Sequence, residues 1–243
     1  MTKKISLKQF LMRTGSFESS LHCESAIRSR EITINNEIVA NPYHFFNPKT
    51  SLVKINGEKL NPIKKLYFIM NKPAGYICQK SKSEKNIYAL LGALNLSKES
   101  IASLFAVGRL DKDTEGLLLI TNHGRLSSIL TEPKNEIVKK YYAVLEKPAD
   151  INKLKMLEKG VEIEIEHKIY KTKKSIIKKT GEKEVYISIS EGRKRQIRKM
   201  FEKIGNEVVY LKRVSIGGLQ LGKLGAGEIK QITREEIIKK LEF

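Results

Sequence analysis

A turn rich in carboxylates is the clearest candidate for chemistry in this sequence. Residues 107–124 read VGRLDKDTEGLLLITNHG, with Asp111, Asp113 and Glu115 between two apolar runs. A loop held between two buried strands has rigid supports, as a reactive group needs. A solvated acidic turn would explain the same residues.

Other interpretations of this turn differ in how well they fit. The D-x-D-x-E-G spacing resembles the start of a calcium-binding EF-hand loop. The twelfth position is Asn122 instead of glutamate, however, and an apolar strand replaces the exiting helix. A glycosidase carboxylate pair stays open, because the sequence cannot give the separation that decides it.

The overall charge points to a polyanionic partner. Lys and Arg number 46 against 27 Asp and Glu, giving +19. This balance favours nucleic acid first and an anionic membrane surface second, although a general lysine bias would produce part of it.

A second segment concentrates that charge. EGRKRQIRKMF at 191–201 carries Arg193, Lys194, Arg195, Arg198 and Lys199. We expect a helix over GRKRQIRKMFEKIGN, with an apolar stripe that begins at Ile197. On this helix Arg195 and Lys199 share one surface, and Arg198 lies nearer the core. Arginine suits phosphate forks and carboxylate pairs, whereas a solvated basic face is the alternative.

Two weaker segments complete the candidates. In KKYYAVLEKP, only one of Tyr141 and Tyr142 can face a given side of a strand, and tyrosine there is more often core than catalytic. In NKPAG at 71–75, Lys72 could contact RNA while the proline and glycine shape a turn. A plain surface turn explains the second segment equally well.

The elements that position these residues fall into two parts. Residues 1–60 predict two helices (from Ile5 to Gly15, and over 20–29) and then a β-ribbon with turns at Asn35-Asn36 and Asn56-Gly57. Residues 61–65 form a linker. Residues 66–243 predict many strands and few helices, the last helix beginning at a Thr233/Glu236 capping box. The fold class is α+β: a small N-terminal domain, then a mixed, mainly antiparallel sheet flanked by helices.

The remaining composition narrows the class. Two cysteines and four scattered histidines favour neither a disulfide framework nor a zinc site. No secretory leader or run of eighteen apolar residues is seen, which predicts a soluble, cytoplasmic protein without a membrane partner, and we expect a monomer.

The four segments, in this order, resemble the motifs of the RsuA-type family of ribosomal RNA pseudouridine synthases. GRLDKDTEGLLLITNHG is similar to the family's central aspartate motif, and NKPAGYIC, KKYYAV and GRKRQIRKMF to the flanking ones. VVYLKRVSIGGLQLGKLGAGEIKQIT resembles its C-terminal strands. Residues 3–60 look like the S-four-type RNA-binding domain that precedes the catalytic domain, with Ser19-Ser20 in place of Ser-Arg and Asn35-Asn36 in place of Asn-Gly.

The resemblance implies roles for individual residues. Asp111 is the nucleophilic aspartate and Arg198 pairs with it. Tyr141 packs against the flipped uracil, and Arg109 fills the space that the base leaves in the RNA. Such enzymes need an extruded base, an aromatic face and an ionised carboxylate beside a guanidinium. The further RNA-binding candidates are Lys72, Arg193, Lys194, Arg195, Lys199, Arg28 and Arg30.

The expected function is isomerisation of uridine in ribosomal RNA, within a pre-ribosomal particle. GYIC, SEGR and IGGLQL look closer to the small-subunit (16S) branch than to the large-subunit (23S) branches. No redox or group-transfer step occurs, so no cofactor and no metal are expected. The alternatives are a 23S enzyme, a non-catalytic rRNA-binding or ribosome-assembly protein and, more distantly, a membrane-surface protein.

Overall fold

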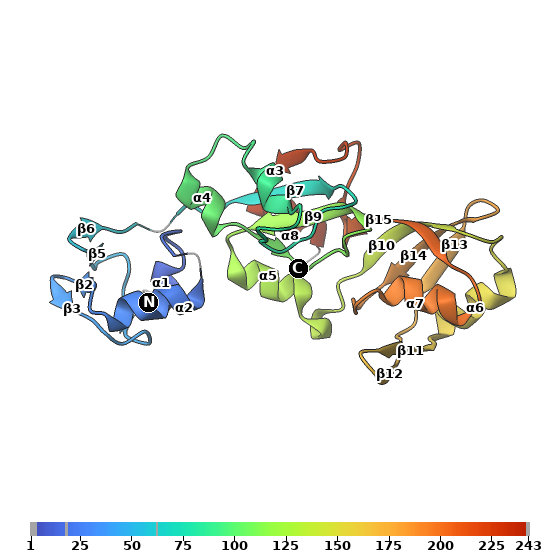
Figure 1. The fold of residues 1–243 in the computed structure, drawn as a ribbon, viewed down its shortest axis with the longest axis horizontal. Helices are drawn as coiled ribbons and strands as arrows, with labels where there is room; N and C mark the ends of the chain where they lie inside the picture. Colours follow the sequence, from blue (N-terminus) through green and yellow to red (C-terminus); the bar gives the residue numbers. More distant parts are fainter. Residues whose placement is uncertain (1–3, 18, 62, 242–243) are drawn as a thin grey trace. The chain divides into compact units, whose positions relative to one another are not determined.

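The computed structural model describes residues 4–17, 19–61 and 63–241. The chain divides into two compact units (Figure 1). One contains the residues up to Leu66 together with Gly92–Phe105, and the other contains Tyr67–Leu91 together with Ala106–Phe243.

The first unit combines short helices with small antiparallel sheets. Its four-stranded sheet has the order β3-β2-β5-β6, and β1 pairs separately with β4. The elements are β1 (Ile5–Ser6), α1 (Leu7–Leu11), α2 (Ser20–Arg28), β2 (Ile32–Ile34), β3 (Glu37–Ile38), β4 (Phe45–Phe46), β5 (Val53–Ile55), β6 (Glu58–Lys59) and α4 (Lys98–Ser103). The two predicted helices and the β-ribbon are therefore present.

Local sequence explains these elements. The Ser6 hydroxyl caps α1, and the apolar face of each helix enters one core, with Phe10 and Ile27 among its buried residues. Asn35 and Asn36 both have positive φ, 53° and 70°. A two-residue turn with both φ values positive matches the twist of the flanking strands.

The second unit is built on one large mixed sheet. Its strand order is β13-β14-β10-β15-β9-β7-β17, with β16 beside β15 and β8 beside β9. The β15–β9 pair is parallel, whereas β10–β14, β10–β15, β13–β14, β15–β16, β7–β17 and β7–β9 are antiparallel. The strands are β7 (Tyr67–Lys72), β8 (Phe105–Val107), β9 (Glu115–Thr121), β10 (Lys139–Leu145), β13 (Ile176–Lys179), β14 (Glu184–Ile189), β15 (Val208–Ile216), β16 (Leu219–Gln220) and β17 (Ile229–Gln231). The mixed, mainly antiparallel sheet expected from the sequence is confirmed.

Residue patterns set the burial of these strands. All six residues of β7 and six of the seven in β9 are buried, and both strands read as apolar runs, as strands covered on two faces do. In β10, by contrast, Tyr141, Ala143 and Leu145 are buried while the residues between them are half-buried. One face of β10 therefore points inward with Tyr141.

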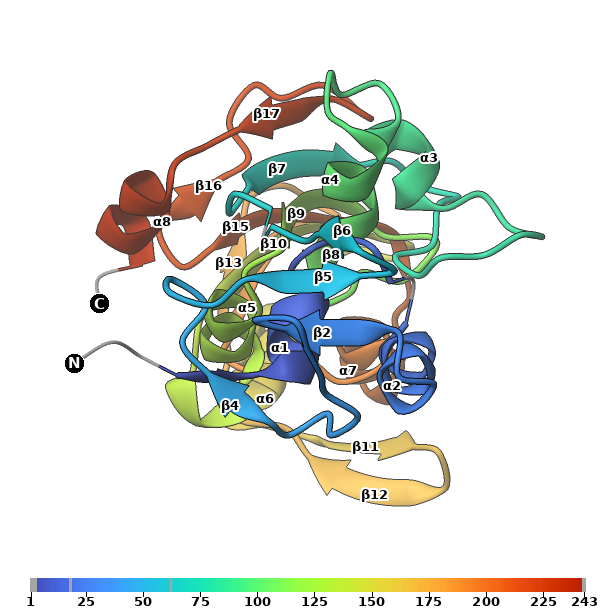
Figure 2. The ribbon, with the colours of Figure 1, turned by 90° about the vertical axis from the view of Figure 1, so that its left-hand side faces the viewer.

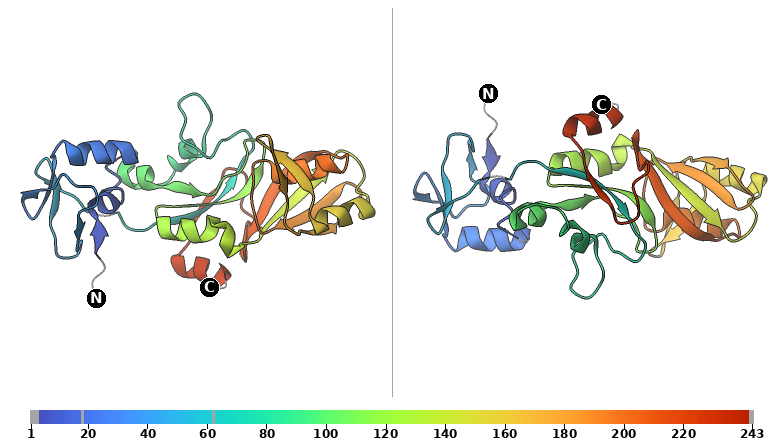
Figure 3. Two further views of the ribbon diagram at one scale, coloured as in Figure 1. Left: turned by 90° about the horizontal axis from the view of Figure 1, so that it is seen from below. Right: turned by 90° about the horizontal axis from the view of Figure 1, so that it is seen from above.

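Helices and one hairpin surround the sheet. The elements are α3 (Ile87–Leu91), α5 (Gly124–Thr131), a 3₁₀ turn (Pro133–Asn135), α6 (Ile151–Lys159), β11 (Glu162–Ile165), β12 (Lys168–Lys171), α7 (Gln196–Lys203) and α8 (Arg234–Leu241). The yellow and orange helices α6 and α7 lie at the β13–β14 end of the sheet (Figure 3). In the part of the chain that the structure describes, β11 and β12 form a separate two-stranded sheet, which lies at the bottom of Figure 2.

The start of α7 corrects one expectation. The predicted helix covers the whole basic run, but α7 begins only at Gln196. The residue before it, Arg195, has a left-handed backbone conformation with a φ of 53°. The side-chain oxygen of Gln196 accepts the Arg193 N–H at 3.0 Å, which closes a turn ahead of the helix. Arg193, Lys194 and Arg195 are therefore loop residues.

The C-terminal helix follows its predicted cap. Thr233 Oγ1 accepts the Glu236 N–H at 3.1 Å, and Glu236 accepts the Thr233 N–H at 2.6 Å. Ile237 and Leu241 of α8 join the main core with Leu117 and Ile216. No helix in the described residues is long and apolar enough to cross a membrane.

Candidate active site

The acidic turn links β8 to β9 and carries Asp111 at its middle. The Thr114 N–H donates to the Asp111 carbonyl at 3.0 Å, and this bond closes the turn. Gly116 follows with a φ of 108°, and a Cβ placed on it would lie 2.2 Å from the Arg213 carbonyl oxygen. Only glycine allows β9 and β15 to approach so closely at the base of the turn.

The three acids of this turn have different surroundings. Asp113 Oδ2 lies 3.1 Å from both Arg195 Nη1 and Arg198 Nη2. Glu115 accepts the Tyr210 hydroxyl at 2.7 Å. Of the three, Asp111 alone lines a cleft of about 690 Å³. The geometry thus singles out Asp111 among neighbours that the sequence leaves equivalent.

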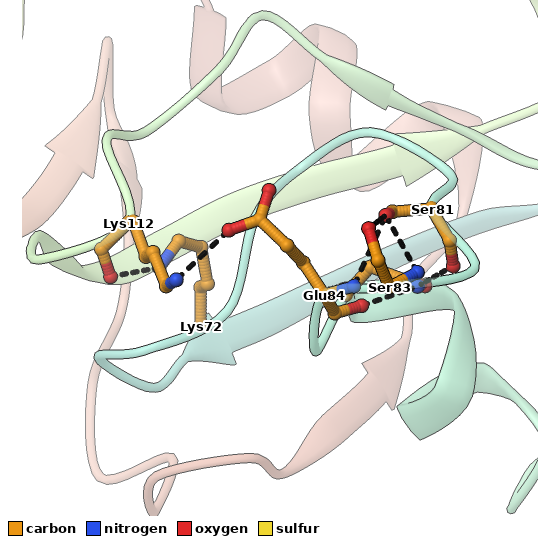
Figure 4. A network of polar contacts seen from close by, with 6 residues as sticks. Lys72, Ser81, Ser83, Glu84 and Lys112 are labelled. Carbon is orange, nitrogen blue, oxygen red and sulfur yellow. Dashed lines mark hydrogen bonds and ion pairs between the residues drawn. The ribbon is translucent and has the colours of Figure 1, made fainter.

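The NKPAG turn is hydrogen-bonded to the acidic turn. The Lys72 ammonium donates to the carbonyl oxygens of Pro73, at 2.9 Å, and Lys112, at 3.4 Å. The Gly75 N–H reaches the same Lys112 oxygen at 2.7 Å, and the Lys112 ammonium pairs with Glu84 at 2.8 Å (Figure 4). Two turns that are distant in sequence are therefore joined next to Asp111.

Lys72 is a correction to the expected RNA contacts. Its side chain is fully buried, with 0% exposed, and burial lowers its pKa. It ends a strand whose residues are all buried, so its ammonium meets backbone carbonyls and cannot reach a phosphate. Its position makes it a support for the loop that carries Asp111.

The cleft gathers several of the predicted site residues. Arg109, Asp111 and Tyr141 line it, and so do the three basic loop residues before α7. Tyr141 is 7% exposed, whereas Arg109 lies in the open. An inward aromatic ring near a half-buried carboxylate, with cations at the rim, can hold a flat base whose backbone stays outside.

Arg198 makes a different contact from the one expected. It pairs with Asp113 instead of Asp111, and its other amino group donates to the Val208 carbonyl. Arg198 is 8% exposed and does not line the cleft. Arg198 lies in the first turn of α7, and from there its guanidinium pairs with Asp113 of the acidic turn. Arg198 therefore ties α7 to the loop that holds Asp111.

The rest of the basic run has specific neighbours. The Arg193 guanidinium lies 3.5 Å from the centre of the Tyr170 ring, and Lys194 pairs with Glu166 at 3.1 Å. The Lys199 ammonium donates to the Glu164 carbonyl and does not line the cleft. These contacts connect α7 and its preceding loop to the β11–β12 hairpin.

Two other candidates lie in the first unit. Arg28 and Arg30 are both exposed. Their role in RNA binding stays a prediction.

Several residues that line the cleft are absent from the sequence-based candidates, and two of them are cations on neighbouring strands. Lys139 and Arg213 line the same cleft as Asp111. Arg213 is 3% exposed. The available signal was its position: Leu211, Arg213 and Ser215 alternate as buried residues of β15, so an arginine occupies an inward position of a strand.

In the described part of the chain, no group of three or more histidine, cysteine, aspartate or glutamate side chains is arranged to hold a metal ion. The cleft brings the Asp111 carboxylate together with the Tyr141 ring and several cations, and Glu132, Glu166 and Glu191 line it as well.

Comparison with known proteins places this chain in one family. Residues 66–203 match the family described as RNA pseudouridylate synthase. The ribosomal small subunit pseudouridine synthase A of Escherichia coli (strain K12) is 34% identical over 87% of this chain and 89% of its own length. The ribosomal large subunit pseudouridine synthase B of Bacillus subtilis (strain 168) is 32% identical over 88% of this chain and 86% of its own.

A solved structure agrees with the sequence comparisons. A crystal structure of a pseudouridylate synthase has a TM-score of 0.69 and 30% identity, covering 98% of this chain and 99% of that one. The chain belongs to the RNA pseudouridylate synthase family. It is therefore an isomerase that acts on uridine in RNA.

Proposed function

We propose that this protein converts a uridine of ribosomal RNA to pseudouridine, with Asp111 as the nucleophile. The observation that carries the proposal is that Asp111, alone among the three acids of its turn, lines the cleft together with Tyr141. Ribosomal RNA is supported by the small- and large-subunit enzymes among the relatives.

The cleft residues take the following parts in this proposal. A stacked base is out of reach of a carboxylate, so the uridine turns out of its stack and enters the cleft. Tyr141 offers its ring face to the uracil, and Arg109 at the exposed rim occupies the place that the base leaves. Arg198 acts through Asp113, by holding the turn in which Asp111 lies.

The test is the variant Asp111→Asn. We expect it to fold and to bind RNA, and to release no tritium from RNA labelled at carbon 5 of uridine. Asp113→Asn is the matched control, because it removes a carboxylate of the same turn outside the cleft. We expect the rate of this control to fall by at most about tenfold, because the change displaces a support of the turn and removes no reacting group. Full activity of Asp111→Asn would sink the mechanism.

For the RNA subunit, we propose 16S ribosomal RNA. The support is the likeness of GYIC, SEGR and IGGLQL to the small-subunit branch. The alternative is 23S RNA, since the large-subunit relative is nearly as similar, 32% against 34% identical. Pseudouridine mapping in cells with and without the protein decides this: an unchanged 16S profile with a lost 23S site overturns the 16S proposal.

For the first unit, we propose an S-four-type RNA-binding domain over residues 1–60, joined by a linker at 61–65 to a catalytic domain over 66–243. Two helices, a small antiparallel sheet and the exposed Arg28 and Arg30 support it. We further propose that the protein acts as a monomer on a pre-ribosomal particle in the cytoplasm. A non-catalytic assembly role would predict salt-sensitive rRNA binding without tritium release.

A further inference from the structure

We propose that Lys139 and Arg213 form a cationic floor in the cleft that binds the carbonyl oxygens of the uracil while it is detached from its ribose. This inference rests on the proposed function of the same cleft. The proposed function gives no role to Lys139 or Arg213, and this inference supplies one for both.

Arg213 has an unused donor in a buried position. Its Nε donates to the Leu117 carbonyl at 2.8 Å, which anchors the guanidinium to β9. Its Nη2 is buried and has no hydrogen-bond partner among the residues that the structure describes. A buried donor without an acceptor destabilises the folded state, and more so when the donor group is charged. A structural role explains the Nε bond but leaves the Nη2 group unexplained.

Strand register places this group beside the proposed base-stacking residue. Arg213 of β15 is the cross-strand neighbour of Tyr141 on β10. Lys139 lies two residues before Tyr141 on the same strand, so it points to the same face. All three line the cleft. A uracil ring lying against Tyr141 would therefore have a cation beside its edge.

The two cations of the floor outnumber the carboxylates beside them. Among the described residues, neither Lys139 nor Arg213 forms an ion pair. The Lys139 ammonium donates to the Ile137 carbonyl at 2.9 Å. Burial lowers the pKa of Lys139 and the buried Glu191 carboxylate opposes this, so Glu191 acts on this cation. It accepts hydrogen bonds from the Lys173 N–H at 2.8 Å, from Gln196 at 2.6 Å and from the Tyr170 hydroxyl, and its single charge offsets at most one of the two cations. The floor therefore keeps a net positive charge.

The reaction has an anion that fits this floor. In the isomerisation the bond from ribose C1′ to N1 breaks with its electron pair on the base, and a bond from C1′ to C5 forms. One proton leaves C5 and one is gained at N1, so no other reactant is consumed. Between these steps the base carries negative charge, which its two carbonyl oxygens share. Donors aimed at charge that develops during a reaction lower its barrier strongly in a site shielded from water.

Burial favours the base over a phosphate as the ligand. Arg213 and Tyr141 are 3% and 7% exposed, at the floor of the cleft. A phosphate stays on the backbone outside, where the exposed Arg193, Lys194 and Arg195 lie at the rim. Only the flat base can reach the floor.

The experiment separates binding of RNA from chemistry. Single-turnover rates at saturating RNA and dissociation constants are measured for Arg213→Gln and Lys139→Met, with Lys230→Gln as a control that removes one exposed charge from β17. We expect about a 100-fold loss of rate for Arg213→Gln, the usual effect of removing one such donor, and about tenfold for Lys139→Met. The dissociation constants should stay within about twofold, since the floor meets charge that exists only after the bond breaks.

Chemical rescue guards against a purely structural effect. Adding guanidinium ion at low millimolar concentration to Arg213→Ala should restore part of the rate, while the same concentration of sodium chloride should not. If the Arg213 variants fail to fold, Lys139→Met decides alone. A wild-type rate in either folded variant, or a weakened RNA affinity at an unchanged rate, overturns the inference.

The two proposals can fail separately. If activity depends on Asp111 but the Arg213 and Lys139 variants are fully active, the floor is refuted. The proposed function is unaffected by that result. A wild-type protein that forms no pseudouridine in any ribosomal RNA refutes both.

Discussion

At the scale of single residues, the site is defined by which of several similar side chains faces the cleft and which are engaged by other protein groups. Asp113 is held by two arginines and Glu115 by a tyrosine, while Asp111 lines the cleft. The same holds for the cations, because Lys72 is fully buried against carbonyls whereas Lys139 and Arg213 line the cleft. Residue type alone does not distinguish these cases, and their partners do.

The Arg198–Asp113 contact should be coupled in activity. We expect Arg198→Met and Asp113→Asn each to lower the single-turnover rate, and the double variant to lose no more than the Arg198→Met variant. The reason is that both remove one support of the Asp111 turn, and residues that act as a unit are not additive. Rates for the full double-mutant cycle check this. Losses that multiply would show that Arg198 acts independently of Asp113.

Lys139 should impose a pH dependence. Burial, followed by the neighbouring Arg213 charge, lowers its pKa to about 8 from an ordinary 10.5, and Glu191 partly opposes this. The lysine is therefore charged below pH 7 and loses its proton as the pH rises through about 8. The ratio of wild-type to Lys139→Met rates should be greatest below pH 7 and decline above pH 8.

Using this ratio removes the titration of the uridine itself, because both enzymes act on the same RNA. The measurement is the single-turnover rate of both proteins from pH 6.5 to 9.5. A ratio that stays constant across the range would show that the Lys139 charge takes no part.

At the scale of elements, the Asp111 turn is fixed by two contacts from other parts of the sheet. The NKPAG turn after β7 grips the Lys112 carbonyl, and β15 closes against Gly116. The parallel pairing of β9 with β15 brings Arg213 to the base of the turn. The site is thus positioned by strands whose order in the sheet differs from their order in the chain.

Gly116→Ala tests this arrangement. Its Cβ would lie 2.2 Å from one Arg213 backbone atom and 2.6 Å from another, so β9 and β15 must separate. We expect a loss of roughly 3 kcal/mol or more in the free energy of unfolding, and a large loss of activity. Gly222→Ala is the matched control: its φ is also positive, at 62°, but nothing lies within 4 Å.

For Gly222→Ala we expect a cost of about 1 kcal/mol and normal activity, the price of a left-handed backbone alone. Denaturant unfolding and rate measurements on both variants make the comparison. Equal losses in the two would refute the proposed close strand contact.

Much of this layout was predictable from the sequence. The apolar runs of β7 and β9, the alternation in β10 and β15 and the Thr233 capping box all gave elements that the structure confirms. The helix over 151–159 was missed, although Asp150 caps it and Leu154 and Leu157 form its buried face. A short amphipathic stretch among many strands gives a weak periodic signal.

The contacts of the site were harder to predict. The pairing of Arg198 with Asp113 depends on where α7 begins, and that depends on a positive φ at Arg195, a non-glycine residue. Lys72 stood in a segment typical of a surface turn but is buried by the acidic loop, 40 residues away in sequence. Both outcomes come from long-range packing, which a local pattern does not contain.

At the scale of the whole molecule, charge is the property that both units share. The net charge of +19 suits a protein that must bind a large polyanion before one base enters a cleft. Phosphate contacts supply affinity and register, while base contacts at the site supply selection. We therefore expect the first unit to affect RNA affinity and the cleft to affect the rate.

The double variant Arg28→Gln/Arg30→Gln tests this division. We expect weaker RNA binding, a salt dependence of the affinity reduced by roughly 0.7–0.9 per lost phosphate contact, and an unchanged rate at saturating RNA. Lys239→Gln/Lys240→Gln removes the same charge from exposed positions of α8 and should change neither quantity. Identical salt slopes for the two double variants would contradict a role for these arginines.

The most direct test of the central claim is a count of pseudouridines in ribosomal RNA from cells that lack this protein. The cells are supplied with either the wild-type chain or Asp111→Asn, at matched protein levels. We predict that one position regains pseudouridine with the wild-type chain and stays uridine with the variant. Restoration by the Asp111→Asn protein, or no position that depends on the wild-type chain, would contradict the account.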